Sequence, residues 1–409
     1  MTFDRAEFTE RHDKIRRRME QEGLDALIAY SNSKVRGCVR YLGNYFTRWV
    51  GAQTQPDGSY QWFGSCAILF PFEGDPVLVT DQPWDEERAK EVSIFDNTYY
   101  AENFGVDFGR LIAERGYRTI GIDNWFVYPA IHYLPLQEQA PDATFRPTML
   151  IEQTYRIKSD KEIELIRRAE HAAVAAVQAG CDAVDVGVSE YEFALAAEHA
   201  LRQHGEIELA GASIISGGPR TATGSGLPSH DDAYVMRSGD WALFDICPSY
   251  AGYAGDISRM IVAGSLDDLE PKLLDMYETT RRMNEEVINA IKPGVTPLAL
   301  NQLAEEIARD RGFEENKIGL LGHSLGVDIH DPPDYYYDGD PLEPNMCITV
   351  EPCLLMPGVA GTRVEDVVLV TPDGCEVLSA ESPKELTDTS SRTTGARGER
   401  PPAGMPTHS

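Results

Sequence analysis

The chain has 409 residues, of which 37 are Lys or Arg and 66 are Asp or Glu, so its formal net charge is −29. With 42% hydrophobic and 25% charged residues, the composition is that of a globular protein, which excludes a disordered chain, a collagen-like chain and a small disulfide-stabilised scaffold. A surface this acidic repels phosphate backbones and argues against nucleic acid as a partner.

The first 155 residues alternate helix-like and strand-like segments. Residues 4–22 have the periodicity of an amphipathic helix that ends at Gly23, and the strand-like run LDALIAY follows. The runs SCAILFPF, DPVLVT and GYRTIGID are further predicted strands, and helices are predicted near residues 85–92 and 106–115. This alternation predicts a compact α/β domain over residues 1–155.

A second domain is predicted over residues 156–383. It begins with a long helix in RIKSDKEIELIRRAEHAAVAAVQAG, capped by Ser159 or Asp160, and a second helix follows a capping box formed by Ser189 and Glu192. Two strand-like runs, DWALFDI and YAGDISRMIVAG, precede helices over residues 267–291 and 297–311.

The last predicted strands of this domain are CITVEPCLL and RVEDVVLVT. Helices on a largely antiparallel sheet make this an α+β domain. Residues 384–409 are small, polar and rich in Pro and Gly, and they are predicted to be a disordered tail.

The hydrophobic pattern and the cysteines predict the cellular location. No apolar run approaches the roughly 20 residues of a membrane span, and the charged first residues lack the apolar core of a secretory signal. The cysteines number seven, and no CxxC pair is found among them. We therefore expect a reducing, cytoplasmic location and no membrane partner.

Four acids and one histidine of the second domain stand inside otherwise apolar segments: Asp245, Asp256, His323, Glu351 and Glu365. An unpaired charge is costly to bury there, and a shared cation removes that cost. A single acid of this kind is more often a salt-bridge partner than a ligand, so the prediction depends on the whole ordered set. Carboxylates with one imidazole suit Mn, Co, Zn or Fe(II), and two such ions about 3.5–4 Å apart activate water.

The motifs around these residues have a recognisable order. The first is RIKSDKEIELIRRA over residues 156–169, and the second is the pair Asp245 and Asp256, which flank Gly252-Tyr253 and are followed by Arg259. The others are GHSLGVDIHDPP with His323 and His330, TVEP with Glu351, and GTRVED with Glu365. In this order the chain resembles the creatinase/prolidase/aminopeptidase P family. The resemblance implies an α/β N-terminal domain followed by an α+β pita-bread catalytic domain, and a homodimer.

The same resemblance implies roles for individual residues. The five residues above correspond to the ligands of two divalent ions, with Glu351 also relaying a proton to the leaving amine. His330 corresponds to the histidine that contacts the substrate carbonyl, although a histidine packed beside two prolines is the alternative. His230 resembles an upstream active-site histidine, at a shorter spacing from the first metal ligand than is usual. Arg363 either orients substrate or neutralises neighbouring acids.

Three departures from the family pattern leave the substrate open. Cys247 follows the first ligand where peptidases have DFG, Ser324 stands where Gly follows the histidine, and Cys353 replaces the Gly of EPG. The first hypothesis is an Xaa-Pro dipeptidase or aminopeptidase P that uses a metal-bridged hydroxide on a small peptide.

Two alternatives remain at this point. One is an enzyme of the same fold acting on a small molecule: a C–N hydrolase of the creatinase or ectoine hydrolase type, or a dimethylsulfoniopropionate lyase. The other is a non-catalytic binding module, against which the complete ligand set argues.

Overall fold

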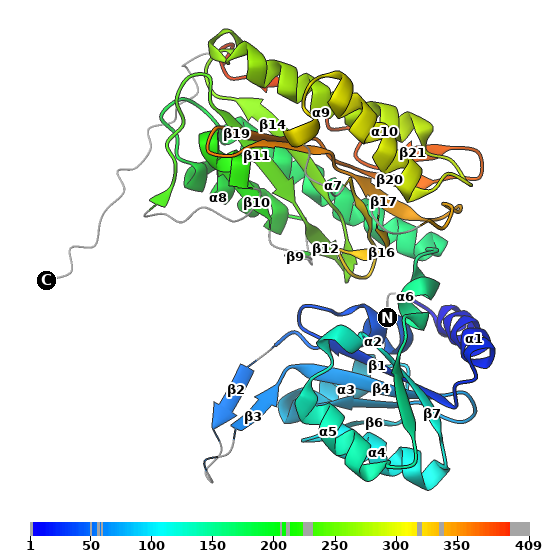
Figure 1. Ribbon diagram of the computed structural model, residues 1–409. Coiled ribbons are helices and arrows are strands. Elements are labelled where there is room, and N and C mark those ends of the chain that lie inside the picture. The colour runs from blue at the N-terminus through cyan, green and yellow to red at the C-terminus, as the bar shows by residue number, and fades with distance from the viewer. Residues whose placement is uncertain are drawn as a thin grey trace, which may run out of the picture.

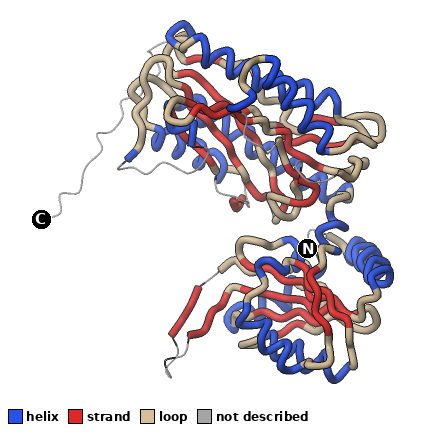
Figure 2. Tube along the Cα trace, viewed as in Figure 1, coloured by secondary structure: helices blue, strands red, loops and turns tan. Residues whose placement is uncertain are grey.

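The computed structural model describes residues 3–49, 51–54, 58, 60–204, 207–209, 213–223, 232–316, 321–334 and 339–392. The chain forms an N-terminal half and a C-terminal half, each with strands in the middle and helices outside (Figures 1 and 2). Within the described residues, no helix combines the length and apolar character needed to cross a bilayer.

The N-terminal half is built on a six-stranded sheet in the order β6-β5-β4-β1-β7-β8. Its strands are β1 (Ala26–Asn32), β4 (Ser65–Pro71), β5 (Val77–Thr80), β6 (Thr98–Tyr100), β7 (Thr119–Asp123) and β8 (Thr144–Pro147). Its helices are α1 (Arg5–Glu22), α2 (Gly37–Gly43), α3 (Glu86–Val92), α4 (Phe104–Arg115), α5 (Ala130–Gln139) and α6 (Leu150–Tyr155). The hairpin of β2 (Gly51–Thr54) and β3 (Tyr60–Phe63) projects from this half (Figure 1).

Helices cover both faces of this sheet, and alternate residues of a strand point to opposite faces, so both sets of side chains are buried. Leu27 and Ala29 of β1 pack in the core that includes α1 and α2, whereas Ile28 and Tyr30 pack in the core that includes α4 and α5. The sequence prediction of an α/β arrangement in this half is confirmed, and α1 ends as expected at Gly23, which is left-handed at φ 64°.

The C-terminal half places two pairs of helices around curved sheets. The helices are α7 (Asp160–Ala183), α8 (Glu190–Arg202), α9 (Pro271–Ala290) and α10 (Pro297–Asp310). Ser159 and Ser189 cap α7 and α8. The capping box predicted at Ser189 is present, and Ser159 forms a second one with Glu162. Helices α7 and α8 share a core with Phe244 and Ile257, and α9 and α10 share another with Trp241 and Ile348.

The strands of this half are mainly antiparallel, as predicted. A four-stranded sheet has the order β10-β11-β14-β22, from β10 (Ile214–Gly217), β11 (Trp241–Ile246), β14 (Ile257–Val262) and β22 (Thr387–Asp388). A five-stranded sheet has the order β16-β15-β17-β20-β21, from β15 (His323–Ser324), β16 (Asp331–Asp334), β17 (Cys347–Val350), β20 (Asp366–Val370) and β21 (Cys375–Val377). Smaller sheets contain β9 (Ile207–Leu209), β12 (Pro248–Tyr250), β13 (Tyr253–Ala254), β18 (Cys353–Met356) and β19 (Ala360–Arg363).

A carboxylate joins the two halves close to β16. Asp328 Oδ1 accepts hydrogen bonds from the backbone N–H groups of Arg36 (2.9 Å) and Gly37 (3.1 Å) at the start of α2. Arg40 Nη2 donates to the carbonyl oxygen of Ala251 at 2.7 Å. The loop that leads into β16 is thereby fixed to the N-terminal half.

The predicted disordered tail over residues 384–409 is wrong for its first part. Thr387 and Asp388 form β22, which pairs in parallel with β14, and Leu386 is buried. Lys384 Nζ contacts Asp366 Oδ2 at 2.7 Å. The sequence did not predict these contacts, because a strand of two residues and one ion pair give no recognisable hydrophobic pattern. Residues 393–409 lie outside the described residues.

The pair between Lys384 and Asp366 gives a prediction about stability and pH. Burial alone would raise the pKa of Asp366, but Arg259 and Lys384 outweigh it and lower that pKa to about 2. Because this lies below the unfolded value of roughly 4, the charged pairs stabilise the fold above pH 4 and this contribution is lost as the pH falls towards 2.

We therefore expect Lys384→Met to lower the free energy of unfolding at pH 7 by about 1.5–3 kcal/mol, the range for hydrogen bonds to charged groups. The loss should shrink at pH 3, as measured by urea unfolding. Lys161→Met is the matched control, because its pair with Glu164 is exposed and such pairs contribute about 0–1 kcal/mol. Equal losses in the two variants, or a loss that is independent of pH, would contradict the assignment.

Candidate metal centre

The five predicted ligand residues lie at neighbouring strand ends of the C-terminal half. Asp245 is near the end of β11, Asp256 directly precedes β14, His323 begins β15, Glu351 directly follows β17, and Glu365 directly precedes β20. The antiparallel register explains the first pair: Asp245 lies opposite Ser258, so the hairpin-like return of the chain brings Asp256 to the same end. An isolated bridge between Ser258 and Glu365 joins this end to the five-stranded sheet.

The structure brings these side chains together. His323 Nε2 lies 3.3 Å from Glu351 Oε1 and 3.7 Å from Asp256 Oδ2. Asp256, His323 and Glu365 each offer one ligand atom, and these atoms all lie within 4.8 Å of one another. Asp245 belongs to an adjoining group of the same kind that shares Asp256. The five predicted residues therefore form one continuous cluster.

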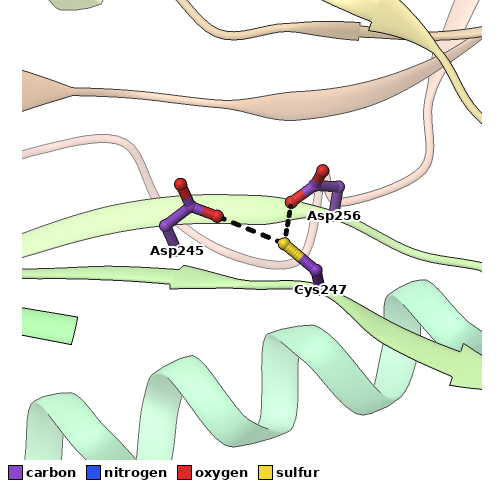
Figure 3. Close-up of side chains that lie close together, drawn as sticks. All are labelled: Asp245, Cys247 and Asp256. Carbon is purple, nitrogen blue, oxygen red and sulfur yellow. Dashed lines mark hydrogen bonds between the residues drawn. The ribbon is translucent and has the colours of Figure 1, made fainter. Parts of the chain in front are cut away.

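The thiol of Cys247 completes the second group (Figure 3). Its Sγ lies 3.1 Å from Asp256 Oδ1 and 3.5 Å from Asp245 Oδ1. The sequence alone singled out Cys247 only as a departure from the family pattern, and its contact with two acids of the site is a finding of the structure.

Hydrogen bonds from the surrounding strands and helix hold the cluster in place. Ser258 Oγ donates to Glu365 Oε2 at 2.8 Å, and the backbone N–H of Asp256 donates to Glu170 Oε2 at 2.9 Å. Neither Ser258 nor Glu170 was predicted. Glu170 is fully buried on the alanine-rich face of α7, and its place beside Asp256 is known only from the structure.

The imidazole of His323 is oriented by its neighbour. Nδ1 lies 3.1 Å from the carbonyl oxygen of Ser324. A carbonyl only accepts, so Nδ1 carries a proton and donates it to that bond, leaving Nε2 to face the carboxylates. A second ring nitrogen bonded to a carbonyl is typical of metal-binding histidines.

The cluster concentrates negative charge in a buried place. Burial raises the pKa of Asp256 and of Glu365 well above the usual carboxyl value, and repulsion from the carboxylates of Asp245 and Glu351 raises both further. Burial alone would lower the pKa of His323, but the adjoining carboxylates raise it to about 9. For Glu351 the effect of burial is outweighed by His323 and Arg363, so its pKa lies below the usual value.

The donor set fits divalent ions. Glu365 is 1% exposed, and its Oε1 has no hydrogen-bond partner within the described part of the chain. A buried carboxylate oxygen without a partner is costly, and a cation shared with Asp256 and His323 would remove that cost. Oxygen donors with one imidazole match the preferences of Mn, Co, Zn and Fe(II).

The three further predicted residues have different positions. The Arg363 guanidinium makes an ion pair with Asp245, and its Nη1 lies 3.9 Å from Glu351 Oε2. The ring of His330 stacks on that of His323, with 3.8 Å between centroids and 12° between planes, and His330 is exposed. His230 lies outside the described residues.

Known proteins resemble the chain along almost its whole length. Residues 164–372 match metallopeptidase family M24, and residues 11–158 match the creatinase/prolidase N-terminal domain. An Xaa-Pro dipeptidase of Lactobacillus delbrueckii subsp. lactis is 29% identical over 383 residues, which are 91% of this chain and 97% of that protein. An Xaa-Pro dipeptidase of Pyrococcus horikoshii is 32% identical over 314 residues, 76% of this chain and 87% of that protein.

Solved structures agree with the sequence relatives. The structure of an Xaa-Pro dipeptidase from Bacillus anthracis superposes with a TM-score of 0.78 at 26% identity, covering 93% of this chain and 99% of that one. The predicted fold class, an α/β domain followed by an α+β pita-bread domain, is thereby confirmed. These matches show that the chain belongs to metallopeptidase family M24 and carries a creatinase/prolidase N-terminal domain before its catalytic half.

Proposed function

We propose that the chain is a metal-dependent exopeptidase that hydrolyses Xaa-Pro dipeptides. The observation that carries this proposal is the buried cluster of four carboxylates and one imidazole in a member of metallopeptidase family M24. The similarity to proteins named Xaa-Pro dipeptidase supports the substrate class.

Two divalent ions of the Mn, Co, Zn or Fe(II) class would be held by five residues: Asp245, Asp256, His323, Glu351 and Glu365. When bound, such ions supply Lewis acidity towards the peptide carbonyl and lower the pKa of water to near neutral. This choice of metals follows from the donor set, which is carboxylate oxygens and one imidazole nitrogen. Of the four metals, manganese is the one that carboxylates suit best.

Glu351 is the proposed proton carrier. Its two oxygens face different cationic groups: Oε1 lies near His323 and Oε2 near Arg363. These neighbours keep the pKa of Glu351 below its usual value, so the side chain is a carboxylate at neutral pH. It can therefore accept a proton from water on one side and deliver it to the leaving proline nitrogen.

His330 and Arg363 are the proposed substrate-binding groups. His330 is exposed and its ring stacks on that of the buried His323, so its side chain can meet both the solvent and the site. An imidazole N–H there would donate to the carbonyl oxygen as charge develops on it. Arg363 is anchored by Asp245, which leaves a fixed positive charge beside the acids for a substrate carboxylate.

We also propose a cytoplasmic homodimer with domains over residues 1–155 and 156–383. All seven cysteines are free thiols, which supports a reducing location. Trp49 and Trp84 are 62% and 57% exposed, and they line a surface hollow of about 850 Å³ near the β2–β3 hairpin. Exposed aromatic rings of this kind are typical of protein interfaces and support self-association.

Hydrolysis of a dipeptide panel tests the substrate class. Metal-depleted protein is reloaded with Mn, Co, Zn or Fe(II) and incubated with Gly-Pro, Ala-Pro and Ala-Ala, and with a tripeptide containing Xaa-Pro. We expect release of free proline from the Xaa-Pro dipeptides, stopped by chelation, and little cleavage of Ala-Ala. A metal-loaded protein that cleaves none of these peptides would overturn the proposed activity.

Metal binding should stabilise the folded protein. Manganese at about 100 times its dissociation constant adds roughly 2.7 kcal/mol to the free energy of unfolding, because it binds only the folded state. We expect a rise in Tm for wild type and for the control Asp373→Asn, an exposed acid of the same half. Asp256→Asn should lose most of this rise, since Asp256 belongs to both donor groups. An unchanged manganese-dependent rise in Asp256→Asn would contradict the site.

His330→Ala should reduce kcat by about 10²–10³, the usual cost of losing one donor to a developing oxyanion. The metal-dependent rise in Tm should remain, because His330 is not among the proposed ligands. His171→Ala is the control, since that exposed histidine pairs with Glu381 on the surface. Loss of metal binding in His330→Ala, or a wild-type kcat, would refute the role given to this residue.

A further inference from the structure

We propose that Cys247 is an additional metal ligand. Its thiolate makes the donor set softer and favours zinc over manganese. The inference rests on the proposed metal-dependent function and adds a sulfur donor to the five nitrogen and oxygen donors already described. Its starting point is that Cys247 Sγ lies between two proposed ligands, Asp245 and Asp256 (Figure 3).

The distances fit donors that share one ion. With a Zn–S bond of about 2.3 Å and a Zn–O bond of about 2.1 Å, a sulfur and an oxygen on the same ion lie about 3.1 Å apart at a right angle and about 3.6 Å apart at the tetrahedral angle. Cys247 Sγ lies 3.1 Å from Asp256 Oδ1 and 3.5 Å from Asp245 Oδ1. Both separations fall inside this interval.

An independent observation points to a cation at the same place. Glu365 is 1% exposed, and its Oε1 has no hydrogen-bond partner among the residues that the structure describes. One of its ligand atoms lies within 4.8 Å of donor atoms of Asp256 and His323, and Asp256 is shared with the group that contains Cys247. Cys247 and the buried acid Glu365 therefore both lie beside Asp256, the residue that the two groups share.

Local chain geometry explains why the thiol reaches this position. Cys247 follows Asp245 by two residues, between β11 and β12, so the two side chains leave the extended chain on the same side. Pro248, which begins β12, directly follows it. Cys247 is buried, with 8% of its surface exposed, so the sulfur faces the cluster and not the solvent.

Ligation would change the preference of the site. The thiol proton leaves to solvent and a bond from Sγ to the metal takes its place. Soft thiolate donors select zinc, whereas sites of oxygen donors alone suit manganese. Without the thiolate, the same carboxylates and imidazole would still bind divalent ions, so the sulfur sets which metal is preferred and does not decide whether one binds.

Cobalt is the spectroscopic probe, because a thiolate bound to Co²⁺ gives a sulfur-to-metal charge-transfer absorption that oxygen and nitrogen donors do not give. Metal-depleted full-length protein is titrated with Co²⁺ and followed by ultraviolet absorption, with calorimetry to count bound ions. The variants are Cys247→Ser and, as control, Cys353→Ser, whose thiol lies beside the Arg363 guanidinium.

We expect the charge-transfer band in wild type and in Cys353→Ser, and its loss in Cys247→Ser with cobalt still bound. The ratio of zinc to manganese affinity should fall in Cys247→Ser by at least about tenfold, the smaller of the losses seen when a group supporting a metal site is removed. Two outcomes would overturn the proposal: wild type that binds cobalt without the band, and a band that persists in Cys247→Ser. Either outcome would leave the proposed function standing. Wild type that binds no metal would overturn both. If Cys247→Ser fails to fold, a wild-type spectrum that lacks the band with cobalt bound still overturns the proposal.

Discussion

Repulsion among buried carboxylates is the constraint on which the C-terminal half depends. Four acids meet at one end of its sheets, where burial already disfavours their charged forms. His323 and Arg363 are cationic groups that contact these acids. The same negative charge that makes these acids costly to bury together attracts divalent cations, so a metal-dependent peptidase gains binding energy from it.

Three of the four acids share a structural device, which is an interruption between two strands. Asp256 separates β13 from β14, Glu351 separates β17 from β18, and Glu365 separates β19 from β20. At such breaks the side chain is free of the strict alternation of a strand, so it can turn towards a common point. Pro352 helps to make one break, since it has no N–H to continue a ladder.

The sequence predicted the fold class and the membership of the cluster, because local signals carry them. Capping boxes at Ser159 and Ser189 mark helix starts, and an acid within an apolar run marks a site. The exact strand limits were not predictable: CITVEPCLL was read as one strand, yet it breaks at Glu351. The thiol of Cys247 and the acid Glu170 depend on which distant side chains face them, and short-range patterns do not contain that information.

The contact between Asp328 and α2 has an evolutionary consequence. Asp328 accepts hydrogen bonds from backbone N–H groups, so a substitution of Arg36 by another residue that keeps its N–H leaves these bonds intact. Position 37 is different, because a Cβ on Gly37 would collide with Asp328 Oδ2. A chimaera that grafts another N-terminal domain onto this catalytic half therefore needs a glycine at this position, in addition to side chains that refill the apolar core that the two halves share.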